Sequence, residues 1–281
     1  MASKSKSGKG AAARRNEDAA RARAEAERLK AVQAAKERRT KLITIGIGAV
    51  VAVAVVVAVV LVLRQSTESN YDEIARPKGA IEAGAIVIGQ DLAAGGAPAE
   101  GEDVAVVRVY SDYICPGCGS LERRLGAKFE ELAAAGKIKL ELQPVAFLDS
   151  QSSPAGYSSR ATNAAMIVAN YAPDKFVAFH AKLFETGTQP DEGTEGLTAE
   201  QLVELAQGLG VPADVTDRFA DSEFSSWVEY ETSQAVADGV GTTPSLWVGK
   251  SDGNLTLITN PGTINLDDAI AKVLDGEDPN K

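Results

Sequence analysis

The longest apolar run of the chain covers residues 42–63, LITIGIGAVVAVAVVVAVVLVL, and contains no charged side chain. At about 1.5 Å per helical residue, a run of this length can cross a hydrocarbon layer roughly 30 Å thick. A buried core helix is the alternative, but so long a run beside a basic cluster is typical of a membrane span. We therefore predict a single transmembrane helix over 42–63.

The charges on the two sides of this run predict its orientation. Residues 1–41 carry 13 Lys/Arg and 5 Asp/Glu, or +8, and residues 64–281 carry 16 and 34, or −18, which together give the −10 of the whole chain. Basic flanks stay in the cytoplasm, so we expect residues 64–281 to lie outside the cell membrane. A cleaved signal peptide would have a shorter apolar region that ends near small residues, whereas RQSTES follows here, so an uncleaved signal-anchor is favoured.

The basic segment 1–41 is expected to be cytoplasmic and partly disordered. Such a segment could bind nucleic acid or anionic lipid. We prefer the simpler interpretation that its charges are solvated and fix the orientation of the membrane span, so we expect no nucleic-acid partner. Residues 64–83 are interpreted as a polar linker. A folded domain is then expected over 84–281.

Strand and helix patterns alternate in this domain. VAVVRVY at 104–110 is an apolar, β-branched run typical of a central strand. A helix is predicted from Pro116 to Gly136, and a long helical region at about 155–238 contains Gly/Pro breaks. Further strands are expected at 137–148, 245–249 and 255–259, and a last helix at 266–274. This order predicts an α/β fold with one central sheet.

The only two cysteines, Cys115 and Cys118, lie in SDYICPGCGS, where the α/β pattern passes from strand to helix. Haem attachment would need a histidine at 119, which is Gly119. A zinc site would need four ligands, and besides the cysteines the chain offers one histidine, His180, so we expect no metal and no cofactor. A structural disulfide remains possible, although so short a loop would stabilise the protein only modestly.

A redox dithiol accounts for more of the pattern. At a helix N-terminus, unpaired N–H groups and the helix dipole favour a thiolate, so Cys115 is the expected nucleophile. Pro116 suits the first helical turn, and Cys118, one turn later, is expected to point inward as the resolving thiol. Pro116 and Gly117 between them are expected to tune the redox potential.

SDYICPGC, together with GTTPSLWVG at 241–249, resembles the DsbA-like branch of the thioredoxin superfamily. The resemblance implies a thioredoxin fold with an inserted helical subdomain at about 155–238. It also implies a cis-proline loop facing the cysteines, formed by Thr243 and Pro244, whose backbone binds the substrate peptide. Strongly oxidising members carry a histidine between the cysteines, and this chain has Pro-Gly there, which leaves the driving force open.

This resemblance implies a protein thiol–disulfide oxidoreductase that oxidises exported cysteine-containing proteins through a mixed disulfide. A disulfide isomerase or a reductase is the alternative within that class, and a membrane-tethered binding or chaperone module without turnover is the alternative outside it. The expected partners are the client proteins and a membrane redox protein that re-oxidises the dithiol. We expect a monomer. Asp112 has either a proton-relay or a turn-capping role, His180 is expected to pack a helix, and Arg108 has no clear role.

Overall fold

The computed structural model describes residues 74–101, 104–251 and 255–281. The chain divides into two units, Met1–Asp72 and Glu73–Lys281, and only the second is described here. The predicted membrane span 42–63 and basic segment 1–41 therefore lie outside the described residues. Within the described ranges, none of the helices is both long and apolar enough to cross a membrane.

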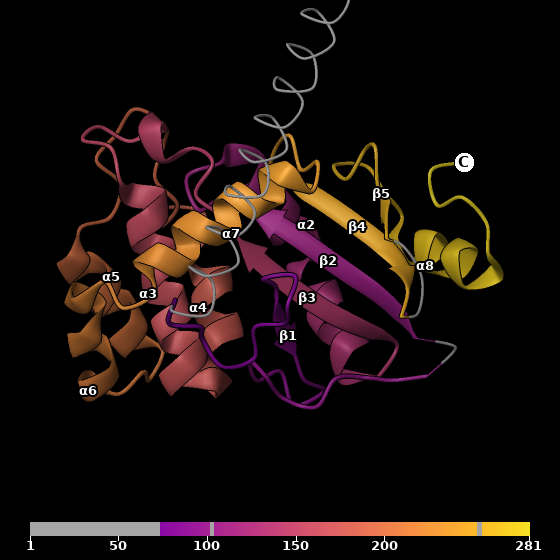
Figure 1. Cartoon of the computed structure of the whole chain (residues 1–281), viewed down its shortest axis with the longest axis horizontal. Helices are drawn as coiled ribbons and strands as arrows, with labels where there is room; N and C mark the ends of the chain where they lie inside the picture. The colour runs from indigo at the N-terminus through magenta and orange to yellow at the C-terminus, as the bar shows by residue number, and fades with distance from the viewer. Residues whose placement is uncertain (1–73, 102–103, 252–254) are drawn as a thin grey trace, which may run out of the picture. The chain divides into compact units, whose positions relative to one another are not determined.

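A mixed sheet forms the centre of the second unit (Figure 1). Its strand order is β1-β3-β2-β4-β5, in which β2 and β3 are parallel and the other neighbours are antiparallel. The strands are β1 (Ile86–Ile88), β2 (Ala105–Ser111), β3 (Ile138–Pro144), β4 (Ser245–Lys250) and β5 (Thr256–Leu257). The expected α/β fold is confirmed, and three of its strands coincide closely with the predicted runs; β1 lies in a segment for which no strand was predicted.

Helix α2 (Pro116–Ala134) connects β2 to β3 and starts within the cysteine motif, directly after Cys115. Leu121, Leu125 and Phe129 recur at helical spacing, and all three side chains are buried against the sheet. Gly136, with φ +70°, ends the helix in the left-handed conformation that glycine adopts without strain. Because β2 is buried along almost its whole length, its carboxyl end is held firmly beneath the helix start.

The helical insertion is confirmed as α3 to α7, and Figure 1 shows it gathered at one end of the sheet. Its helices are α3 (Tyr157–Tyr171), α4 (Phe176–Leu183), α5 (Ala199–Gly208), α6 (Ala213–Thr216) and α7 (Ser225–Ala237). Helix α3 is its centre, since most of its side chains are buried. Three breaks between helices fall at 172–175, 184–198 and 209–212, close to the Gly/Pro positions that predict them, and a fourth at 217–224 contains neither Gly nor Pro.

Residues 74–83 pack onto the domain, although the sequence assigns them to a linker. Ala80 forms a β-bridge with Ile86, and the Lys78 N–H donates to the Asn170 side chain at 2.9 Å. The compact unit accordingly starts at Glu73, and the rest of the proposed linker lies outside the described residues. Backbone hydrogen bonds hold this segment to the domain, and Ile74 and Ala80 pack against the core, so its packing depends on contacts that the short sequence pattern does not show.

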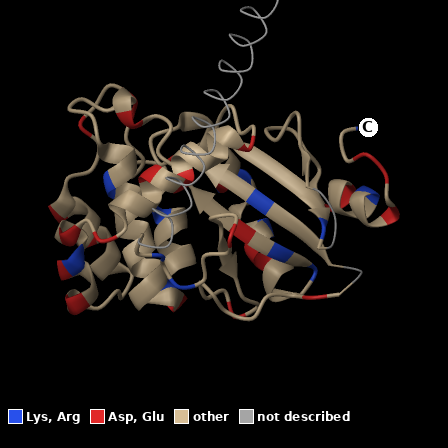
Figure 2. Cartoon of the chain, in the orientation of Figure 1, with Lys and Arg blue, Asp and Glu red and all other residues tan. Residues whose placement is uncertain are grey.

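The last helix, α8 (Leu266–Asp275), agrees with its prediction to within one residue. The Asn265 side chain caps its start by accepting the Asp268 N–H at 3.3 Å, and Gly276 ends it with φ +79°. Lys, Arg, Asp and Glu lie mostly on the outward sides of the helices in Figure 2. This pattern leaves the apolar faces for the core.

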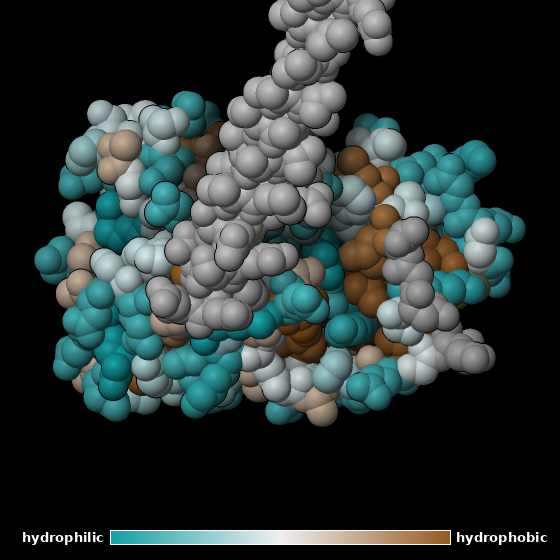
Figure 3. Space-filling model, in the orientation of Figure 1, coloured by the Kyte–Doolittle hydropathy of each residue, from teal (hydrophilic) through white to brown (hydrophobic). Residues whose placement is uncertain are grey.

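Arg108 has a structural partner on the neighbouring strand of the sheet, the buried Glu141. Its guanidinium lies 2.7 Å from the carboxylate of Glu141, the residue opposite it on β3, and Lys139 lies 3.0 Å from the same carboxylate. Hydrophobic side chains gather around β2 and β4 on the face shown in Figure 3, where Tyr110 and Trp247 help to line a hollow of about 350 Å³. Arg108 therefore contributes to the cross-strand packing of the sheet.

Candidate active site

The active-site cysteines lie where β2 passes into α2. Cys115 is the N-cap residue of α2, with an extended backbone (φ −71°, ψ 117°), and Pro116 occupies the first helical position. The proline needs no N–H there, because the first N–H groups of a helix have no partner within the helix. Cys118 follows one turn later, and both cysteines are free thiols. The strand–helix placement predicted for the motif is confirmed.

Cys115 is the acidic thiol of the pair, with a pKa lowered to about 6. The largest cause is a hydrogen bond from the Cys118 thiol; burial opposes the shift, while the Cys118 N–H, Thr243 and the Gly117 N–H lower the pKa further. A free thiol has a pKa of about 8.5, so a large part of Cys115 is thiolate at neutral pH. The arrangement therefore supports the predicted nucleophile.

Cys118 has the opposite environment. Its side chain is only 2% exposed, and its sulfur accepts the Asp112 N–H at 3.4 Å. Burial raises the pKa of Cys118, and the neighbouring Cys115 raises it further. Two thiols in contact titrate as a pair, and here the remaining proton stays on Cys118. The inward orientation expected of a resolving thiol is confirmed, while the resolving role itself stays a prediction.

Thr243 and Pro244 face the cysteines, as the resemblance implies. The Thr243–Pro244 peptide bond is cis, and the Cys115 thiol donates to the Thr243 carbonyl oxygen at 3.4 Å. A groove of about 500 Å³ starts here and runs between α2 and the loop at 261–262. Arg124 of α2 donates to the carbonyl oxygens of Pro261 and, at 3.2 Å, of Ile264, so this wall of the groove is fixed.

Gly117 lies beneath this proline ring. A Cβ atom added to Gly117 would lie 3.0 Å from Pro244 Cδ and 3.7 Å from the Cys115 sulfur. Any larger residue at 117 must therefore share its space with the proline while standing close to the thiol. This position connects the residue between the cysteines directly to the redox centre.

Asp112 holds the turn under the cysteines together. Its buried carboxylate accepts the N–H groups of Ile114 (3.1 Å) and Leu148 (2.8 Å) and the hydroxyl of Ser158 (2.6 Å). Burial raises the pKa of this carboxyl, and the three hydrogen bonds oppose that shift. Of the two roles open for Asp112 from the sequence, these contacts favour the turn-capping one.

With this geometry in view, comparison with known proteins is informative. A profile of the family described as Thioredoxin matches residues 95–256, more than half of the chain. The chain belongs to the thioredoxin family. Its cysteine pair and cis-proline loop both lie inside the matched region.

Solved structures narrow this assignment. Oxidised DsbA from Mycobacterium tuberculosis is 31% identical, with a TM-score of 0.54, over 68% of this chain and 92% of that one. Oxidised BdbD from Bacillus subtilis has a TM-score of 0.55 over 72% of this chain and 100% of that one; at 24% identity it supports the fold alone. This thioredoxin-family protein is a thiol–disulfide oxidoreductase of the DsbA-like type.

Part of the chain also matches a curated protein kinase. The serine/threonine-protein kinase PknE of Mycobacterium tuberculosis is 31% identical over 106 residues, which are 37% of this chain and 19% of the kinase. The chain thus spans about a fifth of the length of the curated relatives it matches. The kinase's own activity carries no conclusion for this thioredoxin-family protein.

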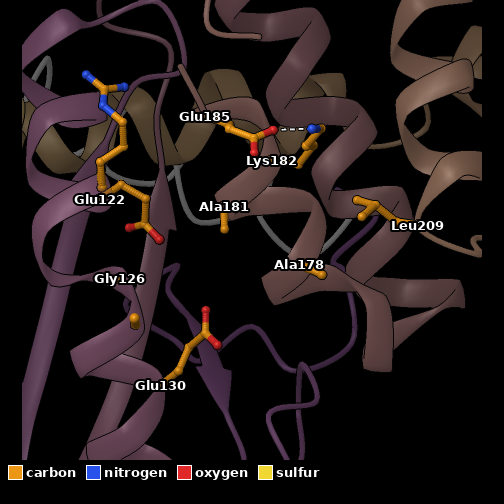
Figure 4. Close-up of a pocket in the computed structure, with 10 residues that line it drawn as sticks. Glu122, Gly126, Glu130, Ala178, Ala181, Lys182, Glu185 and Leu209 are labelled. Carbon is orange, nitrogen blue, oxygen red and sulfur yellow. Dashed lines mark hydrogen bonds and ion pairs between the residues drawn. The ribbon is translucent and has the colours of Figure 1, made fainter. Parts of the chain in front are cut away.

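His180 packs between helices, as expected from the sequence. It is buried on α4, and its Nδ1 atom lies 2.9 Å from the Tyr113 hydroxyl. Its ring also contacts Phe184. Figure 4 shows a neighbouring cavity of about 390 Å³ between α2 and α4, which the carboxylates of Glu122 and Glu130 border. No three His, Cys, Asp or Glu side chains in the described ranges are placed to hold a metal ion.

Gln189 contacts the active-site turn, and the sequence alone does not predict this contact. Its amide nitrogen donates to the carbonyl oxygens of Cys115 (2.8 Å) and Tyr113 (3.4 Å). It lies 74 residues from Cys115, in a loop of the helical insertion. No local pattern marks such a contact, because only the folding of the insertion onto α2 creates it.

Proposed function

We propose that this protein is a membrane-anchored thiol oxidase that forms disulfides in exported proteins outside the cytoplasm. The observation that carries the proposal is the Cys115 pKa of about 6 beside a Cys118 that keeps its proton. Stabilising the thiolate stabilises the reduced form of the pair. The disulfide form then becomes the better oxidant.

The reaction proceeds in two exchange steps. A client thiolate attacks the Cys115 sulfur of the enzyme disulfide, the S–S bond breaks, and the electron pair leaves on Cys118, which takes up a proton. The second client thiolate attacks the client's own sulfur in this mixed disulfide and expels Cys115 as a thiolate. The client loses two electrons and gains a disulfide, and the enzyme is left as the dithiol.

The groove beside Cys115 is where the client peptide would bind. The Thr243 carbonyl oxygen lies 3.4 Å from the Cys115 sulfur, so the backbone at this point could pair with the backbone of a client segment. Such backbone pairing does not depend on the client's side chains, which suits an enzyme that serves many exported proteins. Arg124 keeps the opposite wall at Pro261 in place for that segment.

The proposed location of the catalytic domain outside the cytoplasm is inferred from the sequence. The apolar run 42–63 and its basic flank orient residues 64–281 outwards, where disulfides persist. Re-oxidation of the dithiol there requires an electron acceptor, which we assign to a membrane redox protein. Protease added to intact spheroplasts should digest the catalytic domain, and survival of the domain until lysis would contradict the orientation.

An isomerase or reductase is less well supported. Residues 74–101 pack onto the sheet and include β1, so this segment builds no separate dimerisation domain. A reductase would keep a potential near thioredoxin's. A binding module without turnover would have no use for the different pKa values of the two thiols.

The deciding experiment is oxidation of a reduced, unfolded test protein by the full-length enzyme in detergent. We expect the oxidised enzyme to transfer its disulfide stoichiometrically. Cys118→Ala should accumulate mixed disulfides through Cys115, and Cys115→Ala should form almost none. Equal trapping by both variants would refute the assignment of the nucleophile.

The redox potential separates the oxidase from the reductase. Thioredoxin and DsbA have nucleophile pKa values of about 7 and 3.5 and potentials of about −270 and −120 mV. With a pKa of about 6 for Cys115, between these two values, the potential of this enzyme should lie between about −270 and −120 mV. Equilibration with a glutathione series measures this value, and a potential as low as thioredoxin's would contradict the oxidase.

A further inference from the structure

Hydrogen bonds connect the Gln189 loop of the helical insertion to the active-site turn and to α2. Besides its bonds to the Cys115 and Tyr113 carbonyl oxygens, the Gln189 side chain accepts a hydrogen bond from Arg123 of α2 at 3.2 Å. The same Arg123 nitrogen donates to the Phe184 carbonyl oxygen at 2.6 Å. Gln189 is therefore held at both ends of its amide, which fixes the amide's orientation.

Gly119, directly after the second cysteine, leaves room for this contact. A Cβ atom on Gly119 would collide with the Gln189 side-chain oxygen and would lie 2.6 Å from Arg123 Nη1. Gly119 is an ordinary helical residue of α2 and has no left-handed backbone that would require glycine. An alanine at 119 would favour the helix, but it would displace the ends of the Gln189 and Arg123 side chains, so glycine is what permits this contact.

The contact restrains a torsion that controls the Cys115 environment. Pro116 has a fixed φ, so the ψ angle of Cys115, together with χ1 of its side chain, sets where its sulfur lies relative to the Gly117 and Cys118 N–H groups. Both N–H groups lower the pKa of Cys115. The Cys115 carbonyl oxygen accepts the Gly119 N–H at 3.2 Å and the Gln189 amide at 2.8 Å, so the insertion supplies the shorter of the two restraints on this peptide plane.

We propose that Gln189 is a positioning residue of the thiol–disulfide reaction, which holds the Cys115 peptide so that the thiolate stays under the N–H groups of α2. Gly119 makes its approach possible, and Arg123 orients it. The helical insertion thus contributes to the reactivity of Cys115 as well as to the stability of the domain. The inference rests on the dithiol chemistry of the proposed function and is independent of its net direction.

The first test compares Gln189→Met with Gln201→Met in the full-length enzyme. Gln201 also lies in the insertion, and its side-chain oxygen accepts the Thr198 N–H, so its replacement likewise removes a hydrogen bond that holds backbone. The rate of Cys115 alkylation by iodoacetamide, followed against pH, reports the pKa. Gln189→Met removes all three hydrogen bonds of the side chain, and loss of the one to the Cys115 carbonyl oxygen should raise the Cys115 pKa by about 0.5 to 1 unit and slow alkylation at pH 6 about two- to fivefold. Gln201→Met should leave the profile unchanged.

The second test approaches the same contact from α2. Gly119→Ala displaces the Gln189 amide, so it should raise the Cys115 pKa, whereas Gly208→Ala, with open space around its Cβ, should not. This pair keeps the test decisive if Gln189→Met does not fold. An unchanged Cys115 profile in the folded variants, with only thermal stability lost, would overturn the inference and reduce Gln189 to a structural residue. The parent enzyme's disulfide transfer in the same preparation shows separately whether the proposed function fails.

Discussion

Removing the Cys118 thiol should make Cys115 a weaker acid, because Cys118 supplies the largest contribution to its low pKa. Cys118→Ala deletes that donor and leaves the helix N-terminus, Thr243 and the Gly117 N–H in place. Cys118→Ser is the matched control, since a hydroxyl of similar size keeps a donor at the same position. The comparison separates the effect of the thiol from that of the helix.

The magnitude follows from the strength of a hydrogen bond to an anion. Such bonds contribute about 1.5–3 kcal/mol, and one pKa unit corresponds to about 1.4 kcal/mol. Cys118→Ala should therefore raise the Cys115 pKa by about 1 to 2 units, from about 6 to about 7 to 8. At pH 6 the thiolate fraction would fall from about half to about a tenth or less.

Alkylation with iodoacetamide measures this change without interference from other residues, because Cys115 is the only cysteine left in both variants. The rate should rise with pH along a single titration, with a midpoint near 6 for Cys118→Ser and at least one unit higher for Cys118→Ala. A midpoint that stays near 6 in Cys118→Ala would refute the reasoning, since the helix terminus would then account for the whole shift. Equal midpoints at a raised value in the two variants would also refute it.

Three further changes test other parts of the structure. In the folded domain, burial raises the pKa of Glu231 to about 7, so the stability of the wild type should fall as pH rises from about 4.3 to 7 and then level off. Glu231→Gln should lack this loss when thermal unfolding is measured at pH 4 to 8. Parallel plots of melting temperature against pH for the two proteins would contradict the reasoning. Gly117→His should place the cationic form of an imidazole close to Cys115, which lowers the Cys115 pKa below 6 and raises the potential measured against glutathione. An unchanged Cys115 pKa would show that crowding by Pro244 moves the imidazole away. Because the Cys115 pKa is depressed on folding, the reduced enzyme should gain stability over the oxidised enzyme as pH rises from about 6 to 8.5; a pH-independent difference in their melting temperatures would contradict this.

The fold and the cysteine motif could be predicted because local patterns encode them. A buried β-branched run followed by CPGC defines the strand–helix junction, and Pro116 and Gly136 define the ends of its helix. The orientation of Cys118 follows from its position one turn along that helix. These features depend only on neighbours in the sequence and on the helical repeat.

The contacts around the motif could not be predicted, because they join segments that are distant in the sequence. Asp112 binds Leu148 and Ser158, and Gln189 binds Cys115, across 36, 46 and 74 residues. Their side chains are polar and their sequence surroundings carry no periodic pattern. Such partners become visible only when the insertion is packed onto the sheet.

The pKa values of the two thiols differ although Cys115 and Cys118 lie one turn apart on the same helix, because their surroundings are opposite. Cys115 precedes the first turn, where the N–H groups of Gly117 and Cys118 lower the pKa of its thiol, whereas Cys118 faces the core, where burial opposes charge. Cys115 releases its proton to solvent, and Cys118 keeps its own proton and donates it to the Cys115 thiolate in a hydrogen bond. In the reverse step, Cys118 must lose that proton before it can attack a mixed disulfide, so the same geometry that makes Cys115 a good leaving group makes Cys118 a slow attacker. For the proposed oxidase, a mixed disulfide held in this way would give the client's second thiol time to attack, and net oxidation of the client would prevail over return to the starting state.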